Sequence, residues 1–144
     1  MTKLKLAAAD AEDLEILSAR LQDAAGKLKD FFWLPKLRRF AALVNRFRWE
    51  ESGGQGTRVR AGLRFEGVSK VQSSNVKRGA SEAVVSLLAV RFTPNGEGDP
   101  AGVIELVLAG GGAIRLDVEC IDAELTDLTG PWSAHARPNH QDDA

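Results

Sequence analysis

The sequence has little of what usually gives a first indication of a protein's chemistry. Its 144 residues include one cysteine, one methionine and no tyrosine. A single cysteine excludes an internal disulfide and favours a reducing compartment, and the lack of tyrosine removes a common general acid. Acidic residues interrupt segment 1–13, where a signal peptide would need an apolar core, and no apolar run is long enough to span a bilayer. We therefore expect a cytoplasmic protein.

A strong net charge is also missing. The formal charge of −1 gives no overall attraction to nucleic acid or to an anionic membrane. We expect no membrane partner, and nucleic-acid binding would need a local basic patch. Hydrophobic residues make up 44% and charged residues 27% of the chain, as in ordinary globular proteins. This length suits one domain, which we expect over residues 1–130, followed by a flexible polar tail over residues 131–144.

The first pattern along the chain is helical. Asp10 and Asp13 have the spacing of an N-terminal capping box. Leucines follow at helical spacing, namely Leu14, Leu17 and Leu21. The pattern predicts a helix from about Ala11 to Asp23.

Segment Val103–Cys120 predicts two alternating strands around a glycine turn. Matching the apolar faces of the two strands sets Leu106 opposite Leu116 and leaves Gly110–Gly112 as the loop. The same phase places Cys120 in the core, which argues against a reactive thiol. A phosphate-binding loop would lead into a helix, whereas these glycines lead into a strand.

A second hairpin is predicted from residues 40–49 and 57–66. Alternation turns one set of residues of its first strand inward, namely Ala41, Leu43, Asn45, Phe47 and Trp49. Matched faces then pair Phe47 with Val59 and Leu43 with Leu63. An inward amide at Asn45 needs a hydrogen bond, so it either ties a neighbouring loop or lies at the mouth of a pocket.

The same register places four arginines together on the outward face, namely Arg46, Arg48, Arg58 and Arg60. Opposed like charges repel unless an acid or an anion lies between them, and arginine binds phosphate groups well. These four residues are therefore our candidate anion-binding site, for a phosphate-rich ligand or RNA. The competing interpretation is a solvated face balanced by the nearby acids Glu50, Glu51 and Glu66. The inward aromatic residues argue against RNA, whose bases stack on exposed rings.

Residues 31–34 are apolar without interruption and end at Pro35. One strand cannot turn all four side chains toward one core, so its second face needs a cover. Either the N-terminal helix provides that cover, or Phe31, Phe32 and Trp33 form the interface of a homodimer.

Two segments leave strand and helix open as alternatives. Ala83–Phe92 favours a central strand over a short buried helix. Near Cys120 the alternation changes phase, which favours continued strand to about Leu125 over a helix carrying Ile121 and Leu128 on one stripe.

The remaining polar residues do not form a catalytic or metal-binding pattern. His135 and His140 lack further ligands at metal-binding spacing. The acids Asp122, Glu124 and Asp127 lack the glycine and the terminal glutamate of a calcium loop. We expect no metal, no cofactor and no enzymatic activity.

Together these patterns predict an α+β domain in which an N-terminal helix packs on a mostly antiparallel sheet. The sheet has six or seven strands and is curled into a roll or partial barrel. We expect a non-enzymatic binding or interaction module, with anion, phosphate-ligand or RNA binding through the arginine face as the alternative.

Four segments also carry a resemblance. They are LKLAAADAEDLEILSARLQDA at 4–24, WLPKLRRFAALVNRF at 33–47, VVSLLAVRF at 84–92 and ELVLAGGGAIRLDVECIDAELTDL at 105–128. Together they resemble a family of short bacterial proteins known only as a domain of unknown function. The resemblance spans Leu4 to Trp132, implies a stand-alone bacterial protein, and transfers no catalytic or binding residues.

Overall fold

The computed structural model describes residues 4–47, 57–77, 79–128 and 132–133, which form one α-helix, two short 3-10 helices and eleven strands. Their bounds are β1 Lys5–Ala8, α1 Ala11–Leu21, β2 Ala25–Lys27, η1 Leu28–Asp30, β3 Phe31–Leu34, η2 Pro35–Leu37, β4 Arg39–Phe47, β5 Thr57–Glu66, β6 Val68–Ser74, β7 Val84–Pro94, β8 Gly102–Leu108, β9 Ala113–Val118, β10 Ala123–Asp127 and β11 Trp132–Ser133. No helix in these ranges is long and apolar enough to cross a membrane.

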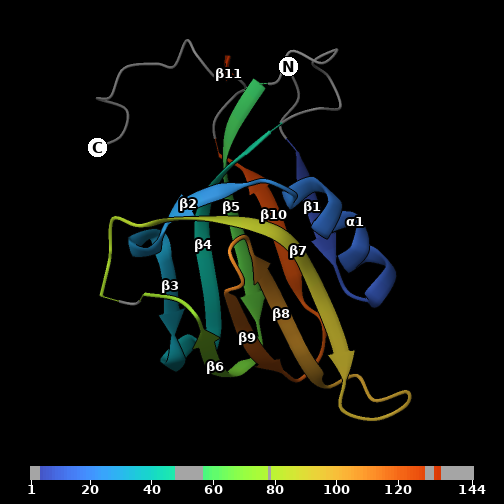
Figure 1. The fold of residues 1–144 in the computed structure, drawn as a ribbon. Helices are drawn as coiled ribbons and strands as arrows, with labels where there is room; N and C mark the ends of the chain where they lie inside the picture. The colour runs from blue at the N-terminus through green and yellow to red at the C-terminus, as the bar shows by residue number, and fades with distance from the viewer. Residues whose placement is uncertain (1–3, 48–56, 78, 129–131, 134–144) are drawn as a thin grey trace.

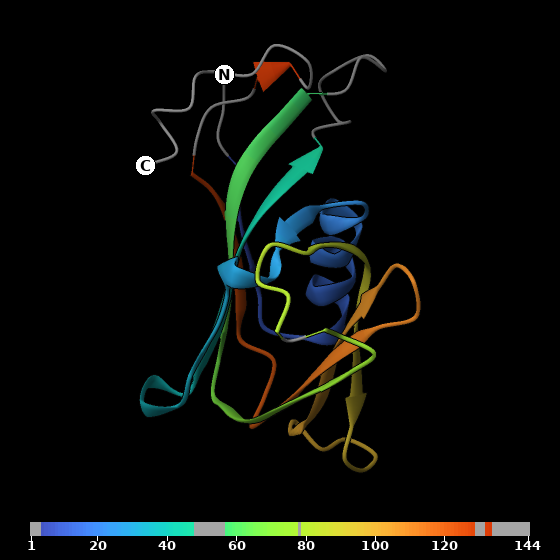
Figure 2. The same cartoon turned by 60° about the vertical axis from the view of Figure 1, so that its left-hand side comes forward.

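The strands form one open, curved sheet in the order β1-β10-β5-β4-β2-β7-β8-β9-β6, with β3 paired to β4 and β11 paired to β5 (Figure 1). Every described strand pair is antiparallel. Figure 2 shows two walls, one containing β4, β5 and β10 and the other containing β7, β8 and β9, with α1 between them. The predicted α+β class is therefore confirmed. The strand number was underestimated because β1, β2 and β11 are too short to show a clear alternation, and because β10 was expected to continue the preceding strand rather than to form a separate one.

The helix begins as its capping residues predict. Asp10 accepts a hydrogen bond from the backbone N–H of Asp13 at 2.8 Å, and the three leucines of the stripe are buried against the sheet. The helix ends at Leu21, two residues before the predicted end, because Asp23 takes a left-handed φ of 68°. The N–H of Asp23 then bonds to Leu87 O at 2.8 Å, which joins the end of the helix to β7.

The hairpin of β8 and β9 has the predicted faces but another register. Leu106 lies opposite Ile114, and Leu116 lies opposite Ile104, so the prediction of Leu106 opposite Leu116 is wrong by two residues. Alternation cannot distinguish registers that differ by two, because both keep the same side chains inward. The turn decides: Leu108 N–H bonds to Gly112 O at 2.9 Å, which makes Gly110 the tip of the loop.

The predicted core position of Cys120 is also wrong, because this thiol is exposed. Strand β9 ends at Val118, and the N–H of Glu119 bonds to Gly67 O at 3.2 Å as the chain leaves the wall. The chain resumes as β10 in the opposite wall, which confirms strand rather than helix for Ala123–Asp127. For Val84–Pro94 the structure likewise confirms a strand, β7, between β2 and β8.

The hairpin of β4 and β5 is shifted by one residue from its predicted register. Phe40 lies opposite Phe65 and Val44 opposite Ala61. The residues predicted to point inward, including Leu43, Asn45 and Phe47, therefore lie on the outer face. Both faces of β4 are similarly apolar, so alternation alone could not select the phase.

Candidate binding surface

The structure does not bring together the four arginines predicted to share one face. Arg46 lies on the inner face of β4 and is 0% exposed. Arg58 and Arg60 lie on the outer face of β5, opposite Phe47 and Asn45, and Arg48 lies outside the described residues. The predicted arginine face is wrong for Arg46 because it depended on the shifted register.

Arg46 instead binds a carboxylate inside the molecule. Its Nε donates to Asp127 Oδ1 at 3.0 Å and its Nη2 donates to Oδ2 at 3.1 Å. The N–H of Leu4 donates to the same Oδ2 at 2.9 Å, and the N–H of Asp127 donates to Leu4 O. Both side chains of the ion pair are fully buried. The pair therefore joins β4, β10 and the start of the chain and is closed to a ligand.

The described arginines of the outer face have partners within the chain. Arg64 Nη2 lies 2.7 Å from Glu124 Oε1, and Arg64 Nε lies 3.1 Å from Glu66 Oε2. Arg60 lies 3.8 Å from Asp30. The Arg58 guanidinium carbon lies 4.3 Å from the centre of the Phe47 ring, which is cation–π geometry. This arrangement favours a balanced, solvated face; of the acids expected to balance it, Glu50 and Glu51 lie outside the described residues.

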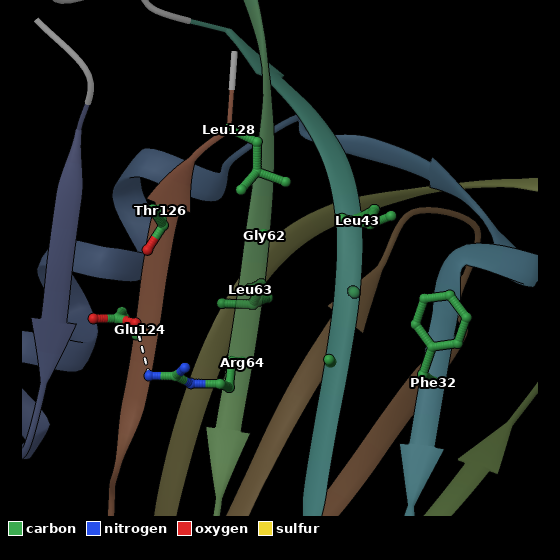
Figure 3. A pocket seen from close by; sticks show the side chains of 10 residues that line it. Phe32, Leu43, Gly62, Leu63, Arg64, Glu124, Thr126 and Leu128 are labelled. Atoms are coloured by element: carbon green, nitrogen blue, oxygen red, sulfur yellow. Dashed lines mark hydrogen bonds and ion pairs between the residues drawn. The ribbon is translucent and has the colours of Figure 1, made fainter. Parts of the chain in front are cut away.

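An apolar hollow of about 430 Å³ opens on the same outer face (Figure 3). Ala41 and Leu43 of β4 and Gly62 of β5 form its floor. Phe32 of β3 and Leu128, directly after β10, stand over that floor and are 40% and 47% exposed. The hollow therefore combines an apolar floor with two large apolar side chains that reach into solvent.

Small residues on neighbouring strands create this hollow. Gly62 has no side chain, and a Cβ built there would lie 3.7 Å from Leu128 Cδ1. The N–H of Leu128 bonds to Arg60 O at 2.7 Å, which holds the leucine beside β5. A larger residue at position 62 would thus occupy the hollow without displacing the backbone.

The polar members of the lining lie on the side of β10. Arg64 and Glu124 are bonded to each other there, and Thr126 is half-buried beside them. Because the two charged groups satisfy one another, the hollow chiefly offers a ligand apolar contact. Thr126 adds one hydroxyl that could donate or accept a hydrogen bond.

The predicted interface residues of β3 divide between the two faces of the strand. Phe31 and Trp33 are half-buried against the core, and the Phe31 ring lies 6.4 Å from that of Phe40. Phe32 and Leu34 point outward and are exposed. The helix packs against β1, β4 and β7 and leaves Phe32 uncovered, so the second face of β3 stays open. The interface itself stays a prediction.

The other candidate residues do not form a site in the described ranges. Glu124 is paired with Arg64, Asp127 with Arg46, and Asp122 is exposed. No group of three His, Cys, Asp or Glu side chains that could hold a metal ion occurs among the described residues. His135 and His140 lie outside the ranges that the structure describes.

Sequence reasoning missed Gly62, Thr126 and Leu128 as members of one surface. The glycine was a usable signal, since glycine inside a strand often marks close approach by another group. No sequence signal pointed to Leu128, because its position over Gly62 depends on the pairing of β10 with β5.

Comparison with known proteins gives a family but no site. Residues 4–140 match the model of a family described as "Protein of unknown function (DUF2948)". No curated protein and no solved structure matches the chain. The match covers nearly the whole sequence and confirms the resemblance to a family of unknown function.

Proposed function

The chain belongs to this family of proteins of unknown function, and we propose that it is a non-enzymatic interaction module that binds a protein partner. Its binding surface is the outer face of β3, β4, β5 and β10. The observation that carries the proposal is the apolar hollow between Phe32 and Leu128. The single cysteine supports a cytoplasmic location.

An exposed apolar cluster of this kind is typical of a binding surface. Isolated surface leucines are common, but a contiguous patch with a hollow and a polar rim marks interaction sites. Phe32 adds a large side chain with few rotatable bonds, and aromatic residues, phenylalanine included, are enriched at protein interfaces. The hollow is large enough to receive an apolar side chain of the partner.

The arrangement of the arginines argues against the anion-binding alternative. Its four arginines are split between the two faces of the sheet, and the described outer arginines already contact acids or an aromatic ring.

Photo-crosslinking tests the proposed surface directly. We would place p-benzoylphenylalanine at Phe32 or at Leu128 and irradiate cells of the native host. The expected result is a discrete covalent adduct from both positions, identified by mass spectrometry. The same label at Ile16, an exposed position on α1, is the matched control for accidental contacts.

A variant that fills the hollow with a side chain tests whether the hollow itself is needed for binding. Gly62→Val should abolish the adducts from both positions without lowering the melting temperature, because a Cβ at position 62 meets only the exposed Leu128 side chain, at ordinary contact distances of 3.7–4.0 Å, and because valine suits a strand. Adducts no stronger than those from Ile16, or adducts that survive Gly62→Val, would contradict the proposal.

A further inference from the structure

Strand β3 has one free edge. Among the described residues it pairs with β4 alone, with Phe32 opposite Ala41 and Leu34 opposite Arg39. The N–H of Phe31 bonds to Leu28 O in η1 and so is directed away from β4. Since hydrogen-bonding direction alternates along an antiparallel strand, the backbone N–H and C=O of Trp33 also point to the free edge.

This edge has few of the features that protect exposed strands from pairing. Natural edges carry charges, prolines or bulges, whereas residues 31–34 are all apolar and pair with β4 without a register shift. Figure 2 shows the β3–η2–β4 hairpin at the margin of the molecule, where another strand can approach. The strand is only four residues long, so any pairing through it buries a limited area.

We propose that β3 pairs antiparallel with β3 of a second copy of this chain, around a two-fold axis that passes Trp33. The inference rests on the proposed function in taking the outer face as the binding surface. In this register Phe32 of one copy lies opposite Leu34 of the other. Opposed residues of an antiparallel pair share a face, so the two outer faces join and their exposed apolar side chains, 40% and 37% exposed in one copy, cover each other.

Charges at the two ends of β3 favour a second copy in this orientation. Asp30 precedes the strand, where its carboxylate lies 3.8 Å from Arg60 of the same chain and is partly exposed, and Lys36 follows the strand. Antiparallel pairing brings each Asp30 near the Lys36 of the other copy, whereas parallel pairing would set like charges side by side. Lys36 is exposed, and none of the ion pairs among the described residues includes it. Each such contact is weak at a surface, but it sets the direction of pairing.

The dimer has a consequence for the binding surface. The two hollows lie on one continuous face, on either side of the paired β3 strands. Because stable interfaces bury about 1,200 Å² or more in total, so short a strand predicts a weak, concentration-dependent dimer.

Disulfide trapping tests the register. The exposed native thiol is first removed by Cys120→Ser, and Phe32→Cys and Leu34→Cys are then combined in one chain. Opposed Cα atoms about 4.5–5.5 Å apart fall within the range for a disulfide. Mild oxidation should give a covalent dimer in which mass spectrometry maps a disulfide from position 32 of one copy to position 34 of the other. Ile16→Cys in the same Cys120→Ser background is the control for random collision.

Sedimentation of the unmodified protein tests association without cross-linking. We expect mass to rise from monomer to dimer with concentration, and Phe32→Asp, at an exposed position, to weaken the association at least tenfold. A monomer at every concentration overturns the inference, as does a disulfide yield no higher than that of Ile16→Cys. Cross-links that join position 32 to position 32 overturn the axis at Trp33.

The two proposals fail in different ways. A monomeric protein whose photo-label at Phe32 captures a different protein overturns the dimer and leaves the interaction module supported. A label that captures only the chain itself supports the dimer. No adduct at all, together with a monomer, overturns both.

Discussion

The two faces of one wall hold the same kind of ion pair in opposite surroundings. On the inner face Arg46 binds Asp127 with contacts of 3.0 and 3.1 Å, and both side chains are fully buried. On the outer face Arg64 binds Glu124 at 2.7 Å, and both groups reach solvent. The carboxylates belong to the same strand, β10. The shorter contact is the weaker one, because water competes for the outer pair but is excluded from the inner pair.

Burial also changes the role of each pair. The inner pair fixes where β4, β10 and the start of the chain meet, since the N–H of Leu4 also bonds to Asp127. The outer pair borders an open apolar hollow and can exchange partners at little cost. A short distance between two charges therefore says little about the contribution of an ion pair until the surroundings are known.

The largest expected effect comes from breaking the inner pair. Asp127→Asn removes the charge and keeps the shape, so the buried Arg46 guanidinium loses its ion pair with the Asp127 carboxylate. We expect a loss of about 3–5 kcal/mol in the free energy of unfolding, measured by urea denaturation. Glu124→Gln is the matched change on the same strand and should cost about 0–1 kcal/mol. Equal losses would show that the two pairs are equivalent and contradict the comparison.

Truncating an apolar residue should likewise lower the free energy of unfolding more on the inner face than on the outer face. Leu63 is buried on the inner face of β5, and Leu63→Ala should cost about 2–5 kcal/mol because it leaves a cavity. Leu43 lies on the outer face of β4 and is half-buried, so Leu43→Ala should cost clearly less. Thermal melts of both variants make the comparison, and a larger loss for Leu43→Ala would mean that the β4–β5 register is wrong.

Replacing the whole inner pair should cost less than breaking it. Arg46→Met with Asp127→Leu removes both charges together, so no unpaired charge stays in the core. The N–H of Leu4 still loses its acceptor, at a cost of about 1–3 kcal/mol. We expect the double variant to recover part of the loss caused by Asp127→Asn. A double variant less stable than Asp127→Asn would contradict the account of the pair.

The smallest effect concerns two ion pairs that share the exposed carboxylate of Glu82. Lys27 Nζ and Lys29 Nζ lie 2.8 and 3.0 Å from the Glu82 carboxylate. The hydrogen bond from Lys27 lowers the pKa of Glu82 below its usual 4.5, and the bond to Glu82 raises the pKa of Lys27 above its usual 10.5. The contribution of Glu82 is present above its unfolded pKa and disappears as pH falls through its lower folded pKa. That of Lys27 is present below its unfolded pKa and disappears as pH rises through its higher folded pKa.

Melting curves of the unmodified protein and of Glu82→Gln check this dependence. The small difference between them should be present between the two unfolded pKa values and vanish in acid. A difference that persists below the folded pKa of Glu82 would show that the variant acts through packing rather than charge.

The helix and the strand faces of β8 and β9 could be predicted from the sequence. Asp10 and the leucine stripe define the helix through contacts a few residues apart, and the strands alternate clearly. The register of the same hairpin could not be predicted, because a shift by two residues keeps every side chain on its face. Its turn geometry, with positive φ at Gly110 and Gly111, selects one register.

The sequence indicated only the part of the candidate surface that lies within a single strand. The apolar run of β3 indicated an uncovered face, and the structure leaves Phe32 exposed there. The arginine face was wrong because both faces of β4 are apolar, and only a partner 81 residues away shows which face is buried. Gly62 and Leu128 could not be linked, since β5 and β10 are distant in the chain.

The sequence by itself determined the α+β class, the helix that begins after Asp10 and the alternating strands, because these depend on side-chain spacing within one element. Tertiary structure alone decided which face of β4 is inside, where the Arg46–Asp127 pair lies, and that an apolar hollow opens beside Phe32. Each of these depends on strands distant in the chain coming together. The alternation of side chains along one strand is the same whichever of its two faces is buried. The strands that pair with it therefore decide which face lies inside.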